Sequence, residues 1–188
     1  MSHKKAQKEK VLRLWLGCTV VVLAILSLIL IAPLTAGSQP QFARSIYGGF
    51  ALLCHQLPER SYFIAGHKFA VCARCTGLYA GFAFTFLLYP LLRPLRAIDW
   101  PPPVWLVLAA VPMAIDFGLT FLGIWENTHT SRLLTGLLLG GVSVFYVMPG
   151  IAELAMRKTR AKQPTFTLAS PERMASAPSD YSAPDRRI

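Results

Sequence analysis

Three of the chain's four cysteines and two of its four histidines gather in one short stretch. Residues 54–75 read CHQLPERSYFIAGHKFAVCARC, with Cys54 at the start and a C-x-x-C pair, Cys72 and Cys75, at the end. Zinc in proteins prefers four thiolate and imidazole ligands in a tetrahedron. A C-x-x-C pair supplies two ligands from one helical face, or from a helix N-terminus where the dipole favours thiolates. The stretch therefore predicts a metal site, with zinc as the expected ion.

The residues leave the fourth ligand open between two histidines. His55 directly follows Cys54, so the two can bind one ion only where the backbone is irregular. His67 lies in an expected loop before Cys72 and reaches the C-x-x-C pair more easily. Spacing alone mildly favours His67.

The same cysteines suit other chemistry. A C-x-x-C pair at the outer end of a four-helix bundle is the layout of membrane thiol–disulfide oxidoreductases. Such enzymes usually need two cysteine pairs, whereas this stretch offers three cysteines. A structural disulfide with one idle cysteine is a further alternative, as is haem with a histidine axial ligand. Covalent haem of the C-x-x-C-H type is excluded, because Thr76 follows Cys75.

The rest of the chain predicts an integral membrane protein. Its 188 residues are 54% hydrophobic and 15% charged, and the mean hydropathy is +0.45. Four apolar segments, residues 12–34, 71–92, 104–123 and 132–151, are each long enough to cross a hydrocarbon core of about 30 Å. The expected fold is all-α: a four-transmembrane-helix bundle between a basic tail (1–11) and a disordered tail (152–188). The first segment exceeds a signal-peptide core, so we expect an uncleaved anchor.

Basic residues indicate the orientation. Most of the 19 Lys and Arg residues lie in the N-terminal tail, near Arg93 and Arg96, or in the C-terminal tail. The positive-inside rule then places both termini in the cytoplasm and the loop of residues 35–70 on the extracytoplasmic side of the membrane. The net charge of +10 would also suit nucleic acid. The basic residues flank apolar segments instead, so we expect contact with the lipid bilayer and no nucleic-acid partner.

Charged residues near the outer ends of the segments predict a polar shell around the metal. A carboxylate inside a membrane span, such as Asp116, needs a partner or a function. Arg74 is the first candidate partner and Arg132 the second. A static ion pair would suffice, whereas a small transporter would use Asp116 to carry protons or substrate. The expected shell consists of Arg60, Arg74, Asp116, Glu126 and Arg132.

Two spans open with the same pattern. Residues 76–81 read TGLYAG and residues 135–140 read TGLLLG. The small-xxx-small spacing predicts close packing of the second and fourth spans, which would bring residues 124–132 beside the cysteines. The repeated pattern is consistent with two related helical hairpins, formed by the first and second spans and by the third and fourth. The same glycine faces could also pair two copies in a homo-oligomer.

Two sets of residues form motifs with a known counterpart. The first set is Cys54-His55-Gln56, Pro58-Glu59-Arg60-Ser61, Gly66, Val71-Cys72-Ala73-Arg74-Cys75-Thr76-Gly77, Tyr79 and Gly81. The second is Asp116, Glu126, Thr128, Arg132, Thr135-Gly136 and Gly140. Together they resemble domain-of-unknown-function family 2085, a group of prokaryotic membrane proteins, over about residues 46–141. The resemblance implies a prokaryotic inner membrane as the location. The family pattern includes the Cys-His pair, which implies His55 as the fourth ligand. His129 stands where the family often has asparagine.

The combined expectation is a Cys₃His zinc site at the extracytoplasmic membrane interface. Its ligands would be Cys54, His55, Cys72 and Cys75, with His67 as the alternative ligand. Four protein ligands close a zinc site, which is then structural. A loose ligand would allow metal-assisted chemistry. The alternatives are a thiol–disulfide oxidoreductase and a small transporter, and the resemblance implies no particular reaction or substrate.

Overall fold

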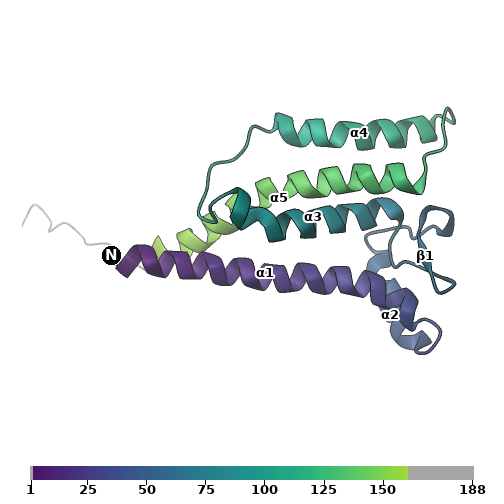
Figure 1. Cartoon of the computed structure of the whole chain (residues 1–188), viewed down its shortest axis with the longest axis horizontal. Helices are drawn as coiled ribbons and strands as arrows, with labels where there is room; N and C mark the ends of the chain where they lie inside the picture. The colour runs from purple at the N-terminus through teal and green to yellow at the C-terminus, as the bar shows by residue number, and fades with distance from the viewer. Residues whose placement is uncertain (1, 161–188) are drawn as a thin grey trace, which may run out of the picture.

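Four long helices lie side by side in the computed structural model, which describes residues 2–160 (Figure 1). They are α1 (Ser2–Thr35), α3 (Ala73–Leu92), α4 (Val104–Phe121) and α5 (His129–Arg160). Each contains a segment that is long and apolar enough to cross a membrane. The prediction of an all-α bundle with four membrane-spanning helices is confirmed.

The helices extend beyond the expected spans at both ends of the chain. α1 begins at Ser2, within the expected basic tail, and α5 continues past residue 151 to Arg160. Residues 152–156 read AELAM, all good helix formers, so nothing in the sequence stops α5 at the membrane boundary. Residues 161–188, most of the tail expected to be disordered, lie outside the described residues.

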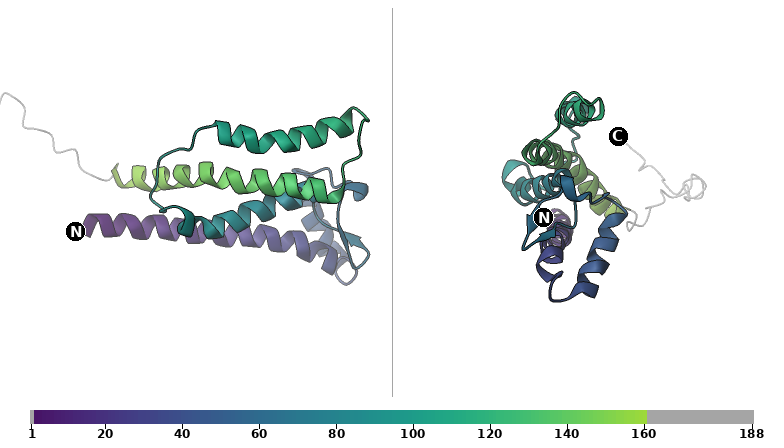
Figure 2. Two further views of the ribbon diagram at one scale, coloured as in Figure 1. Left: turned by 45° about the horizontal axis from the view of Figure 1, so that its top comes forward. Right: turned by 90° about the vertical axis from the view of Figure 1, so that its right-hand side faces the viewer.

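The segment between α1 and α3 forms a small outer layer. It contains α2 (Pro40–Ala51), the one-turn 3₁₀ helix η1 (Pro58–Arg60) and the antiparallel strands β1 (Phe63–Ile64) and β2 (His67–Lys68). Viewed along the bundle, α2 lies across the axis of the long helices (Figure 2). The layer therefore covers one end of the bundle, where α3 and α5 begin.

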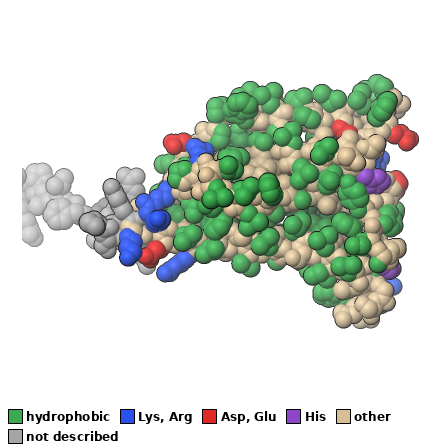
Figure 3. Space-filling model, in the orientation of Figure 1, with side chains coloured by type: hydrophobic (Ala, Val, Ile, Leu, Met, Phe, Trp, Pro, Cys, Tyr) green, Lys and Arg blue, Asp and Glu red, His purple; other side chains and the backbone are tan. Residues whose placement is uncertain are grey.

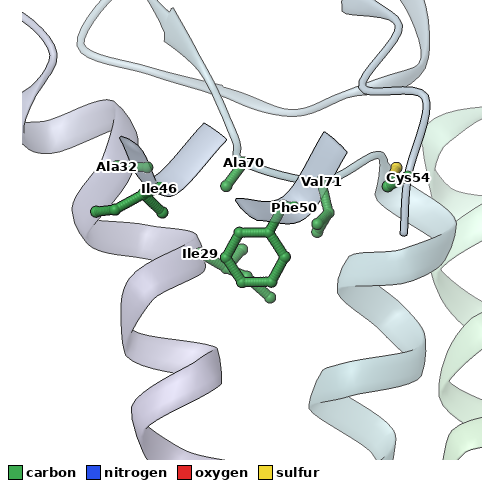
Figure 4. Packing of buried hydrophobic residues seen from close by; sticks show 7 residues of the cluster. All are labelled: Ile29, Ala32, Ile46, Phe50, Cys54, Ala70 and Val71. Carbon is green, nitrogen blue, oxygen red and sulfur yellow. The ribbon is translucent and has the colours of Figure 1, made fainter. Parts of the chain in front are cut away.

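An apolar cluster attaches this layer to the bundle (Figure 4). From α2 it includes Ile46 and Phe50, which share one helical face with Ala43. The cluster comprises Ile29, Ala32, Ile46, Phe50, Cys54, Ala70 and Val71. Cys54 lies at the edge of the cluster, so the same packing that fixes α2 also fixes the position of its sulfur.

Glycines let α3 and α5 approach backbone to backbone. A Cβ atom on Gly77 would lie 2.2 Å from the Leu133 carbonyl oxygen, and one on Gly136 would lie 2.3 Å from that of Arg74. The two contacts are reciprocal, because Gly77 and Gly136 occupy the same place in the two repeats of the pattern. The expected close packing of these spans is observed. Because the contacts are reciprocal, α3 and α5 are related by an approximate two-fold axis that runs along the bundle.

The same packing occupies both glycine faces within one chain. Gly81 and Gly140 meet Leu137 and Leu78 as closely as the first pair of glycines meets its partners. Pairing of two copies through these glycines stays a prediction, and it would compete with their contacts within the chain.

Candidate metal centre

Three cysteine sulfurs converge at the outer layer. Cys54 follows α2, Cys72 caps the N-terminus of α3, and Cys75 lies in the first turn of α3. Their sulfur atoms all lie within 4.8 Å of one another, and Cys54 is buried. All three are free thiols, as is Cys18 within α1. The arrangement joins the loop after α2 to the start of α3 and is close enough to bind a metal ion.

Backbone donors point at the Cys54 sulfur. The backbone N–H of Cys72 donates to Cys54 Sγ across 3.2 Å. Hydrogen bonds from the side chains of Cys72 and Cys75 lower the pKa of Cys54, joined by backbone N–H groups of Cys72 and Gln56, while burial opposes the shift. Donors around a sulfur favour the thiolate, which is the form that binds metals.

Gln56 shapes the backbone next to Cys54. Its φ of 53° lies in the left-handed region, which is unusual for a non-glycine residue. Its Nε2 donates to the Tyr47 carbonyl oxygen (2.7 Å), and its own carbonyl accepts from Lys68 Nζ (2.6 Å). These two bonds hold the strained residue between α2 and β2. The irregular backbone that Cys54 and His55 would need to bind one ion is therefore present at Gln56. No role was expected for Gln56 from the sequence.

The structure does not bring either histidine into the sulfur cluster. His55 is exposed but lines the same pocket as the cysteines. His67 is also exposed, and its Nε2 lies beside Gly37 in the turn that follows α1. Among the side chains that the structure describes, no histidine, aspartate or glutamate atom joins the three sulfurs as a fourth ligand. The assignment of His55 as a ligand stays a prediction.

A polar network lies beside the cysteines. Arg74 pairs with Asp116 (Nη2 to Oδ2, 2.6 Å), so α3 and α4 are joined by an ion pair. Asn127 Nδ2 donates to the same Asp116 oxygen (2.7 Å), and Arg132 Nε donates to Asn127 Oδ1 (2.6 Å). The network thus brings together Arg74, Asp116 and Arg132, three of the residues expected in the polar shell.

Asn127, rather than Glu126, completes this network. Glu126 is exposed and does not line the pocket, whereas Asn127 bridges Asp116 and Arg132. The two residues are neighbours in a loop without regular periodicity, so no spacing rule indicates which side chain turns inward. The signal that could have found Asn127 is chemical, because an amide can accept from an arginine and donate to a carboxylate at once.

A pocket of about 460 Å³ opens next to the three sulfurs. Three arginines line it: Arg60 from η1, Arg74 from α3 and Arg132 from α5. Arg132 is buried, whereas Arg60 is exposed. Cations from three separate segments therefore face the same space as the thiols.

The interior of the bundle beyond this pocket is apolar. Phe86 and Tyr89 of α3 pack with Val144 and Met148 of α5, and all four are almost fully buried. In the described part of the chain, the polar network thus ends at the outer half of the bundle. This packing disfavours a continuous polar path through Asp116.

Comparisons with known proteins agree with the motifs. The model of domain-of-unknown-function family 2085, described as a predicted membrane protein, matches residues 54–146. An uncharacterized protein of Methanocaldococcus jannaschii is 39% identical over 113 residues, covering 60% of this chain and 72% of the relative. An uncharacterized protein of Methanothermobacter thermautotrophicus is 40% identical over 91 residues, covering 48% of this chain and 80% of the relative. No solved structure matches the chain.

Proposed function

The chain belongs to domain-of-unknown-function family 2085, and we propose that it is an inner-membrane protein with a zinc centre at its outer end. Cys54, Cys72 and Cys75 would be the protein ligands. Zinc lies about 2.3 Å from each thiolate, so a tetrahedral site holds its sulfurs roughly 3.8 Å apart. Sulfurs within 4.8 Å of one another reach this spacing by small side-chain rotations. Their convergence is the observation that carries the proposal.

The fourth coordination position would face the pocket. Catalytic zinc sites keep three protein ligands and leave one position to water or substrate, whereas structural sites are closed. Three sulfurs converge here beside a pocket of about 460 Å³. His55 lines that pocket and is the remaining candidate for a fourth protein ligand. An open position would let the ion polarise a bound oxygen, the chemistry of metal-assisted hydrolysis and related reactions.

In the proposed orientation, this centre lies on the extracytoplasmic side of the cell membrane. Basic side chains gather at the end of the bundle where the chain begins, and the histidines visible on this face lie at the other end (Figure 3). The positive-inside rule then puts this end of the bundle, where α1 begins and α5 ends, in the cytoplasm. Fusions of green fluorescent protein and of alkaline phosphatase after α5 test this. Fluorescence without phosphatase activity is expected, and the reverse result contradicts the orientation.

Elemental analysis of the purified protein tests the zinc centre. We expect about one zinc per chain in the unmodified protein and the same content in His55→Ala, because the three thiolates would retain the ion. Absence of metal from the unmodified protein would falsify the proposal. Loss of metal in His55→Ala, with a normal melting temperature, would instead indicate a closed site with His55 as the fourth ligand.

A further inference from the structure

Three arginines surround the pocket, but a single carboxylate lies within the network that faces it. Arg60 and Arg74 lie close enough to Arg132 for their charges to repel. Asp116 pairs with Arg74 alone (2.6 Å) and reaches Arg132 only through Asn127. Like charges gathered in a partly desolvated space are unfavourable unless an anion joins them. The pocket therefore has an excess of positive charge.

The metal centre does not remove this excess. Three thiolates with one divalent ion carry a single negative charge. Three arginines with one aspartate carry two positive charges, so the site as a whole stays positive by one. An anionic group in the pocket would neutralise it.

Arg74 holds a donor that has no partner. Its Nη2 binds Asp116, whereas its Nε is buried and makes no hydrogen bond within the described structure. A buried N–H without an acceptor is unfavourable. Phosphate and carboxylate oxygens are the acceptors that the forked guanidinium geometry fits best. The unpartnered donor belongs to an arginine that lines the pocket, so it adds to the charge argument for an anionic ligand there.

One wall of the pocket is apolar, and it adjoins Arg74, whose Cζ lies 5.7 Å from the centroid of the Phe117 ring. Phe117 and Phe121 of α4 stack with ring centroids 6.1 Å apart, and both remain exposed to the surroundings of the bundle. Leu53 and Leu57 line the pocket from the loop that carries Cys54. α4 lies at the edge of the bundle and packs mainly on α5 (Figure 1). The apolar wall therefore borders the space that lipid would occupy.

From these features we propose that the pocket binds the phosphate group of a lipid, with the arginines on the phosphate and the acyl chains against Phe117 and Phe121. The phosphate would lie beside the open position of the metal, and in that respect the inference rests on the proposed function. Free inorganic phosphate offers the same anionic chemistry without the apolar part. A lipid is favoured because four of the lining side chains, those of Leu53, Leu57, Phe117 and Phe121, give a soluble anion nothing to contact.

Calorimetric titration of the full-length protein in phosphatidylcholine nanodiscs tests the proposal. The probes are short-chain phosphatidic acid, short-chain phosphatidylcholine and inorganic phosphate, and metal content is measured on each sample. We expect phosphatidic acid to bind at least tenfold more tightly than either other probe. Arg60→Ala should weaken its binding roughly tenfold or more, since a hydrogen bond to a charged group contributes about 1.5–3 kcal/mol. The exposed Arg44 of α2 lies outside the pocket, and Arg44→Ala is the matched control that should bind normally.

The outcomes separate the two proposals. Equal binding of inorganic phosphate and phosphatidic acid would overturn the lipid assignment, and Phe121→Ala should then have no effect. Absence of saturable binding by zinc-loaded protein would overturn the anion site while leaving the zinc centre intact. Tight, Arg60-dependent binding by protein that contains no metal would support the lipid site and refute the zinc centre.

Discussion

Replacing Gly136 by alanine tests how the bundle positions the candidate site. The added Cβ would lie 2.3 Å from the Arg74 carbonyl oxygen and 2.9 Å from the Leu78 nitrogen, both of them backbone atoms of α3. Neither atom can rotate away, so α3 and α5 must separate by roughly 1 Å to restore ordinary contact. Overpacking of this kind destabilises proteins by about 1–3 kcal/mol. A domain of this size then melts about 2–12 °C lower.

Melting followed with a thiol-reactive fluorescent dye suits this experiment, because the dye reports both unfolding and exposure of the cysteines. Gly136→Ala should melt lower and should expose Cys72 and Cys75 at lower temperature, since Arg74 lies between them in sequence. Gly118 of α4 is the matched control, because a Cβ there meets nothing within 4 Å. Gly118→Ala should melt at or slightly above the unmodified protein. If Gly136→Ala is as stable as Gly118→Ala, the close approach of α3 and α5 is wrong.

Three further predictions concern the site itself. Cys72→Ser should lower zinc affinity about 10²–10³-fold, because the ligands share a zinc-binding free energy of about 10–16 kcal/mol. Cys18→Ser is the control and should keep the metal. Elemental analysis measures the zinc content of both variants. Asp116→Asn should lower stability by about 1–3 kcal/mol, because Arg74 loses its pair in a partly buried site. Asp99→Asn, at an 87% exposed side chain, should change stability by less than about 0.5 kcal/mol. Zinc chelation alone should make the three thiols alkylatable and residues 55–71 sensitive to protease, and mass spectrometry measures both effects. If alkylation of the thiols requires a reductant, a disulfide is favoured instead.

The long helices and their closest contact could be predicted because each rests on a repeated chemical pattern. Hydropathy over about 20 residues indicates a span regardless of its neighbours. Glycines spaced four apart indicate a close helix pair, and both repeats of the pattern meet as expected at Gly77 and Gly136. The Arg74–Asp116 pair followed from the same logic, because a carboxylate inside a span needs a cation.

The irregular outer layer could not be predicted in the same way. α2 has apolar residues at helical spacing and a proline in its first turn, but this pattern does not indicate which surface the helix covers. The inward turn of Asn127 and the outward turn of Glu126 depend on backbone angles in a loop. His55 and Gln56 pose the same problem, since one left-handed residue decides which neighbouring side chain faces the cysteines. Single dihedral angles of this kind leave no periodic signal in a sequence.

The candidate site lies at the outer end of the bundle, where α3 and α5 meet in an approximate two-fold relation. The glycine pattern brings the two outer helix ends together equally, so the repeat provides a symmetric frame. Of these two helices, only α3 carries cysteines at its N-terminus, and at the position equivalent to Arg74 α5 has Leu133. The asymmetry therefore comes from a few substitutions on a symmetric frame, together with Asp116 from α4 and Cys54 from the outer layer. A frame fixed by backbone contacts can hold sulfurs, arginines and carboxylate at set distances, which is what a metal centre beside an anion pocket requires.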